Sequence, residues 1–422
     1  MIGKGSPDKL LTDEEIKSII AQAVDEMAAD GKSVLVIVPD LTRTCPLPLI
    51  ARTLNEYLGK RASKMDFLVA LGTHPELTEQ QIAKLFGIEQ GKWTETFGNS
   101  KVFNHQWKNP QALLEIGKLT AEQVEQITNG LFKMDVPVTI NRLIYDYDKV
   151  LIVGPVFPHE VVGFSGGNKY FFPGICGEEL LNFFHWLGAV ITNPKIIGTK
   201  YTPVRATIDR AAEMIKVDKA ALCLVTDERG VYGLYFGDVE QAWSAAADLS
   251  AKIHIEYMDK PFESVLARAP EMYDDIWTAG KCMYKAECIV ADGGELIIYA
   301  PHVTEISYTH GKIIDEIGYH TRDYFLKQWD KFKKYPWGVL AHSTHVRGIG
   351  TYENGVEKCR VNVILATGIP PERCKKVNLG YRDPASINPA DWQNKQDEGR
   401  FYIARAGETL YKLKNPPEWQ RF

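Results

Sequence analysis

The sequence predicts an α/β protein with two α/β domains, mostly parallel sheets and an active-site cleft between the domains. Helix-like and strand-like segments alternate along the chain, as in βαβ units. The strand-like segments are continuous runs of branched apolar residues, which is typical of strands covered on both faces. The 422 residues exceed the roughly 100–200 residues of one domain. We expect an N-terminal domain over 1–260, a second domain over 261–400, and a tail, 401–422, that packs back on the first.

The elements of the first domain follow from spacing and side-chain type. Apolar residues recur at helical spacing from Asp13 to Met27, after the cap candidate Thr12, and Ser33–Val38 is a branched apolar run that predicts a buried strand. The same reasoning predicts helices over 49–58 and 238–255, and strands over 65–71, 149–153, 222–226 and 233–236. This order indicates a parallel sheet.

The second domain is expected to begin with a helical link over 261–270. Strands are then predicted over 287–290, 295–300, 337–340 and 361–366, with helical segments between them. Lys281 lies on one such helix, where it is either a solvated lysine or a group that reaches a substrate carboxylate. His342–Gly348 is expected to be a polar loop after strand 337–340, either lining the cleft or serving as a plain connection.

Composition excludes several classes of function. The 49 Lys and Arg against 54 Asp and Glu form no basic stripe, so nucleic acid is not an expected partner. No apolar stretch approaches the roughly 20 residues that cross a bilayer, and the charged N-terminus lacks a signal-peptide core. We therefore expect no membrane association and a cytoplasmic location. Seven irregularly spaced cysteines without a CxxC pair predict neither a disulfide framework nor structural zinc.

Polar loops follow several predicted strands, at the edge where open α/β sheets bind ligands. One loop carries Asp40, Thr42 and Arg43, which suit hydrogen bonds to a sugar hydroxyl and to a phosphate or carboxylate. A simple Asx-type turn with a surface arginine explains the same residues. The loop Gly163–Lys169 combines glycines, a hydroxyl and a lysine, as a phosphate-binding loop does, but it lacks the P-loop spacing and is also compatible with an ordinary glycine-rich loop.

Three histidines are candidates for chemistry. His74 and His159 lie in loops after strands, and His185 follows the aromatic residues of a predicted helix. Two imidazoles that face one substrate can remove and return protons, and a third can bind a metal. Each histidine taken alone is also compatible with a structural role. No HExxH or tight His/Cys cluster occurs, so a metal would have to be held mainly by a cofactor, with one protein ligand.

In order and spacing, these motifs resemble the nickel-pincer lactate racemase family. The matching elements are the DxTR loop, the loop around His74, the histidine ten residues before the GFSGGxK lysine, His185 sixteen residues after that lysine, and the A-x-K-x-M element at Lys281. The resemblance is clear over about residues 30–300 and weaker beyond. It implies a racemase or epimerase with a Ni(II)-pyridinium-3,5-bisthiocarboxylate mononucleotide, and hence cofactor-synthesis enzymes as maturation partners.

The resemblance also implies roles for individual residues. Lys169 would join the cofactor covalently and His185 would bind nickel, while His74 and His159 would be the acid/base pair. The remaining roles are cofactor binding by Asp40, Thr42, Arg43, Gly166 and Gly167, and substrate binding by Arg43, Thr278 and Lys281. The implied reaction is reversible hydride transfer from a small-molecule 2-hydroxy acid to the cofactor. Lactate-specific members carry glutamine where this chain has Thr278, so the resemblance suggests a larger substrate, such as an aldonate or a hydroxy diacid.

Two alternatives remain at this point. One is an NAD-type or metal-independent hydroxy acid enzyme, against which the absence of GxGxxG after the first predicted strand argues. The other is a non-catalytic nickel-cofactor-binding protein. Such a carrier needs Lys169 and His185 but has no use for both His74 and His159, which the chain retains.

Overall fold

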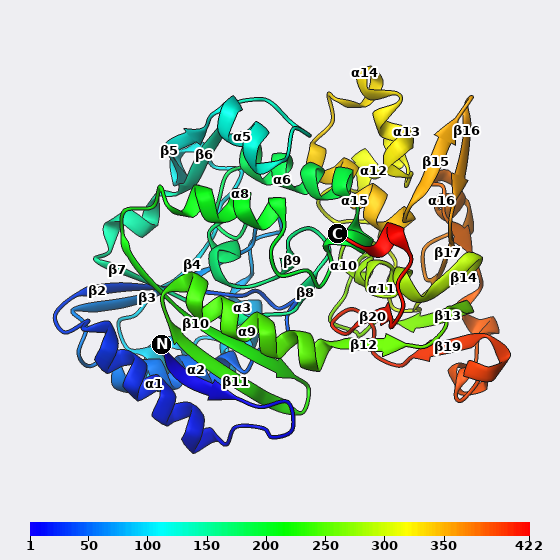
Figure 1. Ribbon diagram of the computed structural model, residues 1–422. Coiled ribbons are helices and arrows are strands. Elements are labelled where there is room, and N and C mark those ends of the chain that lie inside the picture. The colour runs from blue at the N-terminus through cyan, green and yellow to red at the C-terminus, as the bar shows by residue number, and fades with distance from the viewer. The chain divides into compact units, whose positions relative to one another are not determined.

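The chain divides into two compact units, each assembled from segments that are separate in the sequence. The computed structural model describes residues 1–422 (Figure 1). Unit 1 comprises Met1–Phe157, Ser165–Leu181 and Arg205–Ile253, and unit 2 comprises Pro158–Phe164, Asn182–Val204 and His254–Phe422. No helix of the structure is long and apolar enough to cross a membrane.

Unit 1 is built on a seven-stranded sheet in the order β1-β11-β10-β7-β2-β3-β4. The five strands from β10 to β4 are parallel, and β11 and β1 add an antiparallel edge. From the centre of the sheet, β2 leads outward to β3 whereas β7 leads to β10 on the other side, so the strand order reverses between β2 and β7. Ligands of open α/β sheets bind at such a reversal. The strands are β1 (Ile2–Gly5), β2 (Ser33–Val38), β3 (Lys64–Val69), β4 (Val102–Asn104), β7 (Lys149–Pro155), β10 (Asp218–Asp227) and β11 (Gly230–Gly237).

The helices of unit 1 form where caps and apolar spacing dictate. Thr12 caps α1 (Asp13–Met27) with a full capping box, in which the Thr12 hydroxyl accepts from the Glu15 amide and the Glu15 carboxylate accepts from the Thr12 amide. The other elements of unit 1 are α2 (Leu47–Tyr57), α3 (Glu79–Phe86), α4 (Trp93–Phe97), β5 (Leu113–Leu119), α5 (Ala121–Ile127), β6 (Val136–Asn141), the first part of α6 (Glu178–Ile191), and most of α8 (Pro203–Ala212) and α9 (Val239–His254).

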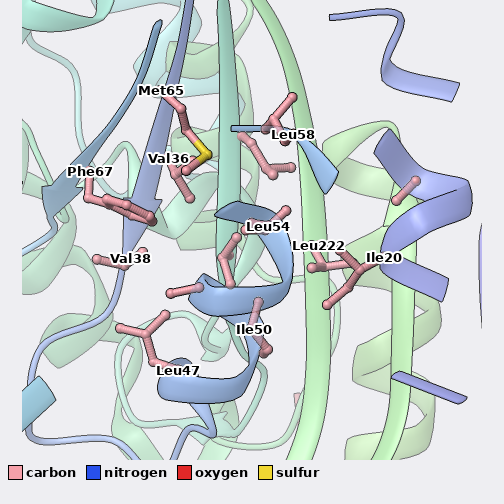
Figure 2. Packing of buried hydrophobic residues seen from close by; sticks show 14 of the residues in the cluster. Ile20, Val36, Val38, Leu47, Ile50, Leu54, Leu58, Met65, Phe67 and Leu222 are labelled. Carbon is pink, nitrogen blue, oxygen red and sulfur yellow. The ribbon is translucent and has the colours of Figure 1, made fainter. Parts of the chain in front are cut away.

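The core of unit 1 lies between the helices and the sheet. Figure 2 shows Ile50 and Leu54 of α2 beside the sheet strands that carry Val36 and Leu222, and all four side chains are at most 1% exposed. Burying side chains of this size stabilises the fold by about 1.5–3 kcal/mol each. The core therefore holds the strands whose ends carry the polar loops.

Unit 2 is built on a five-stranded, wholly parallel sheet in the order β18-β17-β14-β13-β19. Its strands are β13 (Phe262–Arg268), β14 (Val290–Ala300), β17 (Asn362–Thr367), β18 (Gly380–Tyr381) and β19 (Arg400–Ile403). Shorter pairs are β8 (Pro158–His159) with β9 (Gly163–Phe164), β12 (Ile255–Met258) with β20 (Leu410–Leu413), and β15 (Gly350–Glu353) with β16 (Val356–Cys359). The helices are α7 (Asn193–Ile196), α10 (Ile276–Ala279), α11 (Lys281–Tyr284), α12 (Gly311–Ile317), α13 (Arg322–Leu326), α14 (Trp329–Phe332), α15 (Trp337–Arg347) and α16 (Pro371–Lys376).

The α/β class and the mostly parallel sheets are confirmed, but three local predictions in unit 2 are wrong. The predicted link 261–270 is mainly strand β13, whose residues Val265–Ala267 are fully buried. The predicted strand 337–340 is the first turn of α15, so His342–Arg347 continue a helix and form no loop. Residues 287–289 form a 3-10 turn before β14. Short apolar runs fit a buried strand or a buried helix equally well, because burial on all sides removes periodicity.

The division of the chain also differs from the expected one. Unit 1 ends at Ile253, and unit 2 includes three segments from the expected N-terminal domain, 158–164, 182–204 and 254–260. The tail belongs to unit 2, where β20 pairs with β12, a strand within the expected N-terminal domain 1–260, and β19 pairs with β13. Backbone pairing of this kind joins residues about 150 positions apart in β12 and β20, which local sequence patterns do not encode.

Candidate functional site

In unit 1, the loop after β2 and the loop after β3 meet through Asp40 and His74. Asp40 Oδ2 lies 2.6 Å from His74 Nδ1, and Asp40 Oδ1 accepts hydrogen bonds from the Thr42 amide at 3.0 Å and the Thr42 hydroxyl at 2.7 Å. Asp40 is buried, whereas the His74 side chain is 32% exposed. A carboxylate at Nδ1 fixes the tautomer and leaves the Nε2 lone pair available. His74 is therefore oriented to accept a proton at Nε2.

Neighbouring groups keep the Asp40 carboxyl ionised. Burial by itself raises the pKa of this carboxyl, but the charges of His74 and Arg43 and the hydrogen bonds from His74 and Thr42 outweigh burial and hold the pKa below its usual range. The Asx-type turn considered from the sequence is present at Asp40 and Thr42. Both Asp40 oxygens bond within the protein, so the geometry gives Asp40 the task of orienting His74, which sequence reasoning did not assign to it.

The glycine-rich loop of unit 1 holds Lys169 on a short 3-10 turn. Gly166 and Gly167 have φ of 82° and 58°, and a Cβ on Gly167 would lie 2.8 Å from Trp243 Cβ. Only glycine fits a left-handed position so close to another side chain. The Trp243 indole N–H in turn donates to Ser165 O at 2.9 Å. The loop is clamped directly before Lys169.

Three other contacts complete this clamp. The Arg205 guanidinium lies 4.1 Å from the Trp243 ring centroid and is buried. The Ser165 amide donates to Phe157 O at 2.7 Å, and the Lys169 amide donates to Gly166 O at 3.2 Å. These amides are used inside the protein, so this part of the loop positions Lys169 rather than forming an open cradle of N–H groups.

The polar loops of unit 1 converge. The Gly72 amide, two residues before His74, donates to Gly174 O at 2.9 Å, and the Gly174 amide donates to Lys169 O at 3.1 Å. Burial raises the pKa of Tyr170, the residue after Lys169, and the charges of Arg43 and Asp40 also act on it. Backbone bonds therefore connect the loop of His74 to the segment that begins at Lys169, and the charges of Arg43 and Asp40 act on the next residue, Tyr170.

His159 belongs to unit 2, where it ends the short strand β8. Its Nδ1 accepts a hydrogen bond from the Val161 amide at 3.1 Å, and Glu160 Oε2 lies 3.3 Å from the same atom. Neutral His159 with Nδ1 as acceptor carries its proton on Nε2. His159 thus presents an N–H hydrogen-bond donor at Nε2, whereas His74 presents a lone pair.

His185 lies inside helix α6 and not after it. Its imidazole is half-buried and stacks on Phe184, with ring centroids 4.7 Å apart. Lys281 is the first residue of α11, with Nζ 4.5 Å from the Tyr273 ring centroid. Thr278, on α10, is buried, and its amide donates to Asp275 Oδ1 at 3.0 Å. Helices therefore carry the predicted metal and substrate groups of unit 2.

Helix α15 brings His342 to the same part of unit 2. The His342 ring stacks on Trp277 at 4.0 Å, and a Cβ on Gly280, next to Lys281, would lie 3.4 Å from His342 Cε1. Burial lowers the pKa of His342 well below its usual value, and the charges of His345, His310 and His185 lower it further. Burial also lowers the pKa of His345 to about 3. Both α15 histidines are uncharged at neutral pH.

Three buried polar residues of unit 2 escaped the sequence reasoning. Lys285 Nζ donates to Pro158 O at 2.5 Å, directly before His159. Asn193 Nδ2 lies 3.3 Å from Glu287 Oε2, just beyond α6. The available signal was the presence of Lys285 and Glu287 inside the apolar stretch that follows Lys281. Charged residues at such positions are almost never fully buried unless they are paired or hydrogen-bonded.

The donor set fits a cofactor-held metal. No group of three or more His, Cys, Asp or Glu side chains in the structure is placed to hold a metal ion. Lys169 offers an amine on a clamped turn, and His185 offers a half-buried imidazole. One lysine for attachment and one histidine as ligand are the groups that a lysine-linked metal nucleotide needs from the protein.

Sequence comparison finds similar proteins among the lactate racemases. Residues 8–197 match the lactate racemase N-terminal domain family. Lactate racemases of Lactiplantibacillus plantarum and Thermoanaerobacterium thermosaccharolyticum are 22% identical over 282 residues and 23% identical over 283 residues. Each alignment covers 66% of this chain and 62% of the relative, so the chain matches somewhat less than two thirds of those proteins.

Two solved structures share the fold. A crystal structure of a protein from Thermotoga maritima is 35% identical, with a TM-score of 0.89, over 97% of this chain and 100% of that chain. The lactate racemase apoprotein of Thermoanaerobacterium thermosaccharolyticum is 18% identical, with a TM-score of 0.72, over 94% of this chain and 92% of that chain. Residues 8–197 therefore belong to the lactate racemase N-terminal domain family, and the chain as a whole shares the fold of a lactate racemase apoprotein.

Proposed function

We propose that the chain is an isomerase, a racemase or epimerase of 2-hydroxy acids that works with a nickel-pincer nucleotide attached to Lys169. The observation that carries the proposal is the pair of histidines with opposite proton arrangements. His74 is held by Asp40 with Nε2 ready to accept a proton, and His159 is held by the Val161 amide with its Nε2–H ready to donate a hydrogen bond to the substrate oxygen. A reaction that inverts one carbon needs an acid and a base that exchange roles.

The chain's own residues divide the work. In one direction His74 Nε2 takes the proton of the substrate hydroxyl, and the ionised Asp40 stabilises the imidazolium that forms. In the return step a histidine restores the proton to the oxygen. The presence of both His74 and His159 allows both enantiomers of the substrate to react. When bound, the nickel nucleotide supplies the hydride acceptor that a weakly acidic carbon requires.

Substrate and cofactor binding fall to the other predicted residues. Lys281 and Arg43 carry the positive charges for the substrate carboxylate, and His185 is the proposed nickel ligand. Thr42, Gly166 and Gly167 are proposed to line the nucleotide. Thr278 is a short side chain beside Lys281, which supports a 2-hydroxy acid larger than lactate.

The test is production of the protein together with cofactor-synthesis enzymes, followed by mass analysis of the peptide that contains Lys169 and by nickel determination. We expect a mass adduct on Lys169 and about one nickel per chain, as one attachment residue and one ligand imply. A panel of enantiopure 2-hydroxy acids, including lactate, malate and gluconate, then identifies the substrate by loss of optical purity. A bare lysine without nickel under these conditions would favour a freely exchanging nucleotide instead.

A further inference from the structure

One short segment of unit 2 is bonded to the backbone beside His159 and to residues just beyond the ends of α6 and α15. We call Lys285, Ala286 and Glu287, which follow α11, the anchor segment. Its two charged side chains are 4% and 1% exposed, and neither lies at the surface where such residues usually occur. Buried charges are tolerated only when hydrogen bonds replace the water they lose. The partners of these two side chains therefore indicate what the segment does.

Lys285 bonds next to His159. Its ammonium donates to Pro158 O at 2.5 Å and to Glu408 O at 3.0 Å. Pro158 is the residue before His159 and belongs to the same two-residue strand. A strand this short has few backbone bonds of its own, so the ammonium fixes the main chain from which the His159 side chain extends.

Glu287 bonds to the ends of the helices that carry His185 and His342. Its Oε2 accepts from Asn193 Nδ2 at 3.3 Å, and its Oε1 accepts from the Ile349 amide at 2.8 Å. Asn193 lies two residues after the end of α6, and Ile349 lies two residues after the end of α15. Asn193 Nδ2 also reaches Tyr284 O, the last residue of α11, at 3.1 Å.

The space around Glu287 makes these bonds necessary. A cavity of about 30 Å³ is lined by Glu287, Asn193, Thr344 and His345 among others. Asn193 Oδ1 and His345 Nε2 are buried there without a hydrogen-bond partner. Packing alone therefore does not fix the helix ends at this point, and the carboxylate supplies the fixed connection.

We propose that Lys285 and Glu287 are positioning residues, of which Lys285 fixes His159 through Pro158 and Glu287 fixes His185 through Asn193. The catalytic consequence rests on the proposed function, whereas the placement of the two histidines is a property of unit 2 itself. Each positioning residue therefore has its own histidine, and the two effects can be separated.

The first experiment uses the purified protein without cofactor, treated with diethylpyrocarbonate. Mass spectrometry follows the modification rates of His159 and His185 separately. Lys285→Met, which keeps the aliphatic shape, should raise the modification rate of His159 by at least about threefold. The rate at His185 should be nearly unchanged, because loss of one hydrogen bond loosens the structure only locally. Glu287→Ala should do the reverse, and Glu287→Gln, which retains an acceptor, should lie between Glu287→Ala and the unchanged protein.

The matched control is Tyr147→Phe in unit 1. Tyr147 donates to the buried Asp66 carboxylate at 2.5 Å, so this change also removes one buried hydrogen bond, but it touches neither histidine. Variants are compared at equal distance below their melting temperatures. Equal rate increases at both histidines in every variant, control included, would show that Lys285 and Glu287 only stabilise the fold and would overturn the proposal.

The second experiment uses the loaded enzyme and separates the two proposals. Lys285→Met should lower kcat with little change in KM, because His159 is proposed to move protons, and should leave the Lys169 adduct intact. Glu287→Ala should lower the nickel retained per chain. A loaded parent enzyme that isomerises no 2-hydroxy acid would overturn the proposed function, and the modification rates of His159 and His185 would still decide the positioning roles.

Discussion

The two units hold their histidines in contrasting ways. In unit 1, His74 lies on a loop, is 32% exposed and is bonded to a buried carboxylate at 2.6 Å. In unit 2, His159 is 7% exposed and its Nδ1 accepts from a backbone amide, with the nearest carboxylate, Glu160, at 3.3 Å. The partner of Nδ1 is thus a carboxylate at His74 and a backbone amide at His159. Two chemically identical side chains thus acquire different roles because the hydrogen-bond partner of Nδ1 differs.

The same contrast extends to the surroundings. Unit 1 presents charged groups on loops, among them Asp40, Arg43 and Lys169. In unit 2 the candidate groups lie mainly on helices. The α15 imidazoles His342 and His345 are uncharged because burial lowers their pKa values.

Removal of either histidine should have the largest effect. His74→Ala or His159→Ala should lower kcat of the loaded enzyme by about 10²–10⁴-fold, the usual contribution of a general acid or base. Polarimetry measures the rate, and intact mass verifies that the Lys169 adduct is retained. A variant that is loaded and retains full activity would remove that histidine from the mechanism.

Asp40→Asn should have the next largest effect. An amide cannot stabilise the imidazolium and can select the wrong His74 tautomer, so we expect kcat to fall by about a hundredfold. The matched variant Glu160→Gln removes the more distant carboxylate beside His159 and should cost less than about tenfold. Equal losses in the two variants would contradict the contrast between the units.

Thr278→Gln should change substrate preference. The longer amide fills space beside Lys281, so kcat/KM for acids larger than lactate should fall by about tenfold while that for lactate is retained. Thr278→Ser serves as the control, because it removes a single methyl group and keeps the helix N-terminal hydrogen bond to Asp275. The measurement is kcat/KM for lactate and gluconate side by side. A parallel fall for both substrates would point to misfolding rather than to specificity.

The smallest expected effect is on the pH dependence of folding stability. The pKa of Asp40 is lowered in the folded protein, so its ionisation stabilises the fold above the unfolded pKa of about 3.9, and this contribution is lost as the pH falls through the folded value. The melting temperature of Asp40→Asn should therefore lie below that of the parent protein at pH 6, and the difference should shrink toward pH 3. Calorimetry at several pH values measures it, and a difference that is constant with pH would rule out this linkage.

Much of the site on unit 1 could be predicted from local sequence. The capping box at Thr12, the branched run Ser33–Val38 and the polar loops with Asp40 and His74 are all encoded by neighbouring residues. Parallel strands bring their carboxyl ends to one edge, so the meeting of these loops follows from strand order alone. The hydrogen bond that gives Asp40 its role joins residues 34 positions apart and was not predicted.

Unit 2 was harder to predict because its signals are not local. Trp337–Leu340 resembled a strand, but it starts α15, where every residue from Gly338 to Val346 is buried and no amphipathic period remains. The roles of Lys285 and Glu287 depend on Pro158, Asn193 and Ile349, which come from three distant segments. No pattern in the residues around Lys285 predicts these hydrogen-bond partners.

The sequence by itself determined the α/β class, the strands of unit 1 and the residue types available for chemistry, because secondary structure and strand-end loops depend on neighbours in the chain. The tertiary structure decided the composition of the units, the helical state of α15 and the proton arrangement of His74 and His159. These features depend on which buried groups meet, and a hydrogen bond between distant residues sets the tautomer and charge of an imidazole only after the chain has folded.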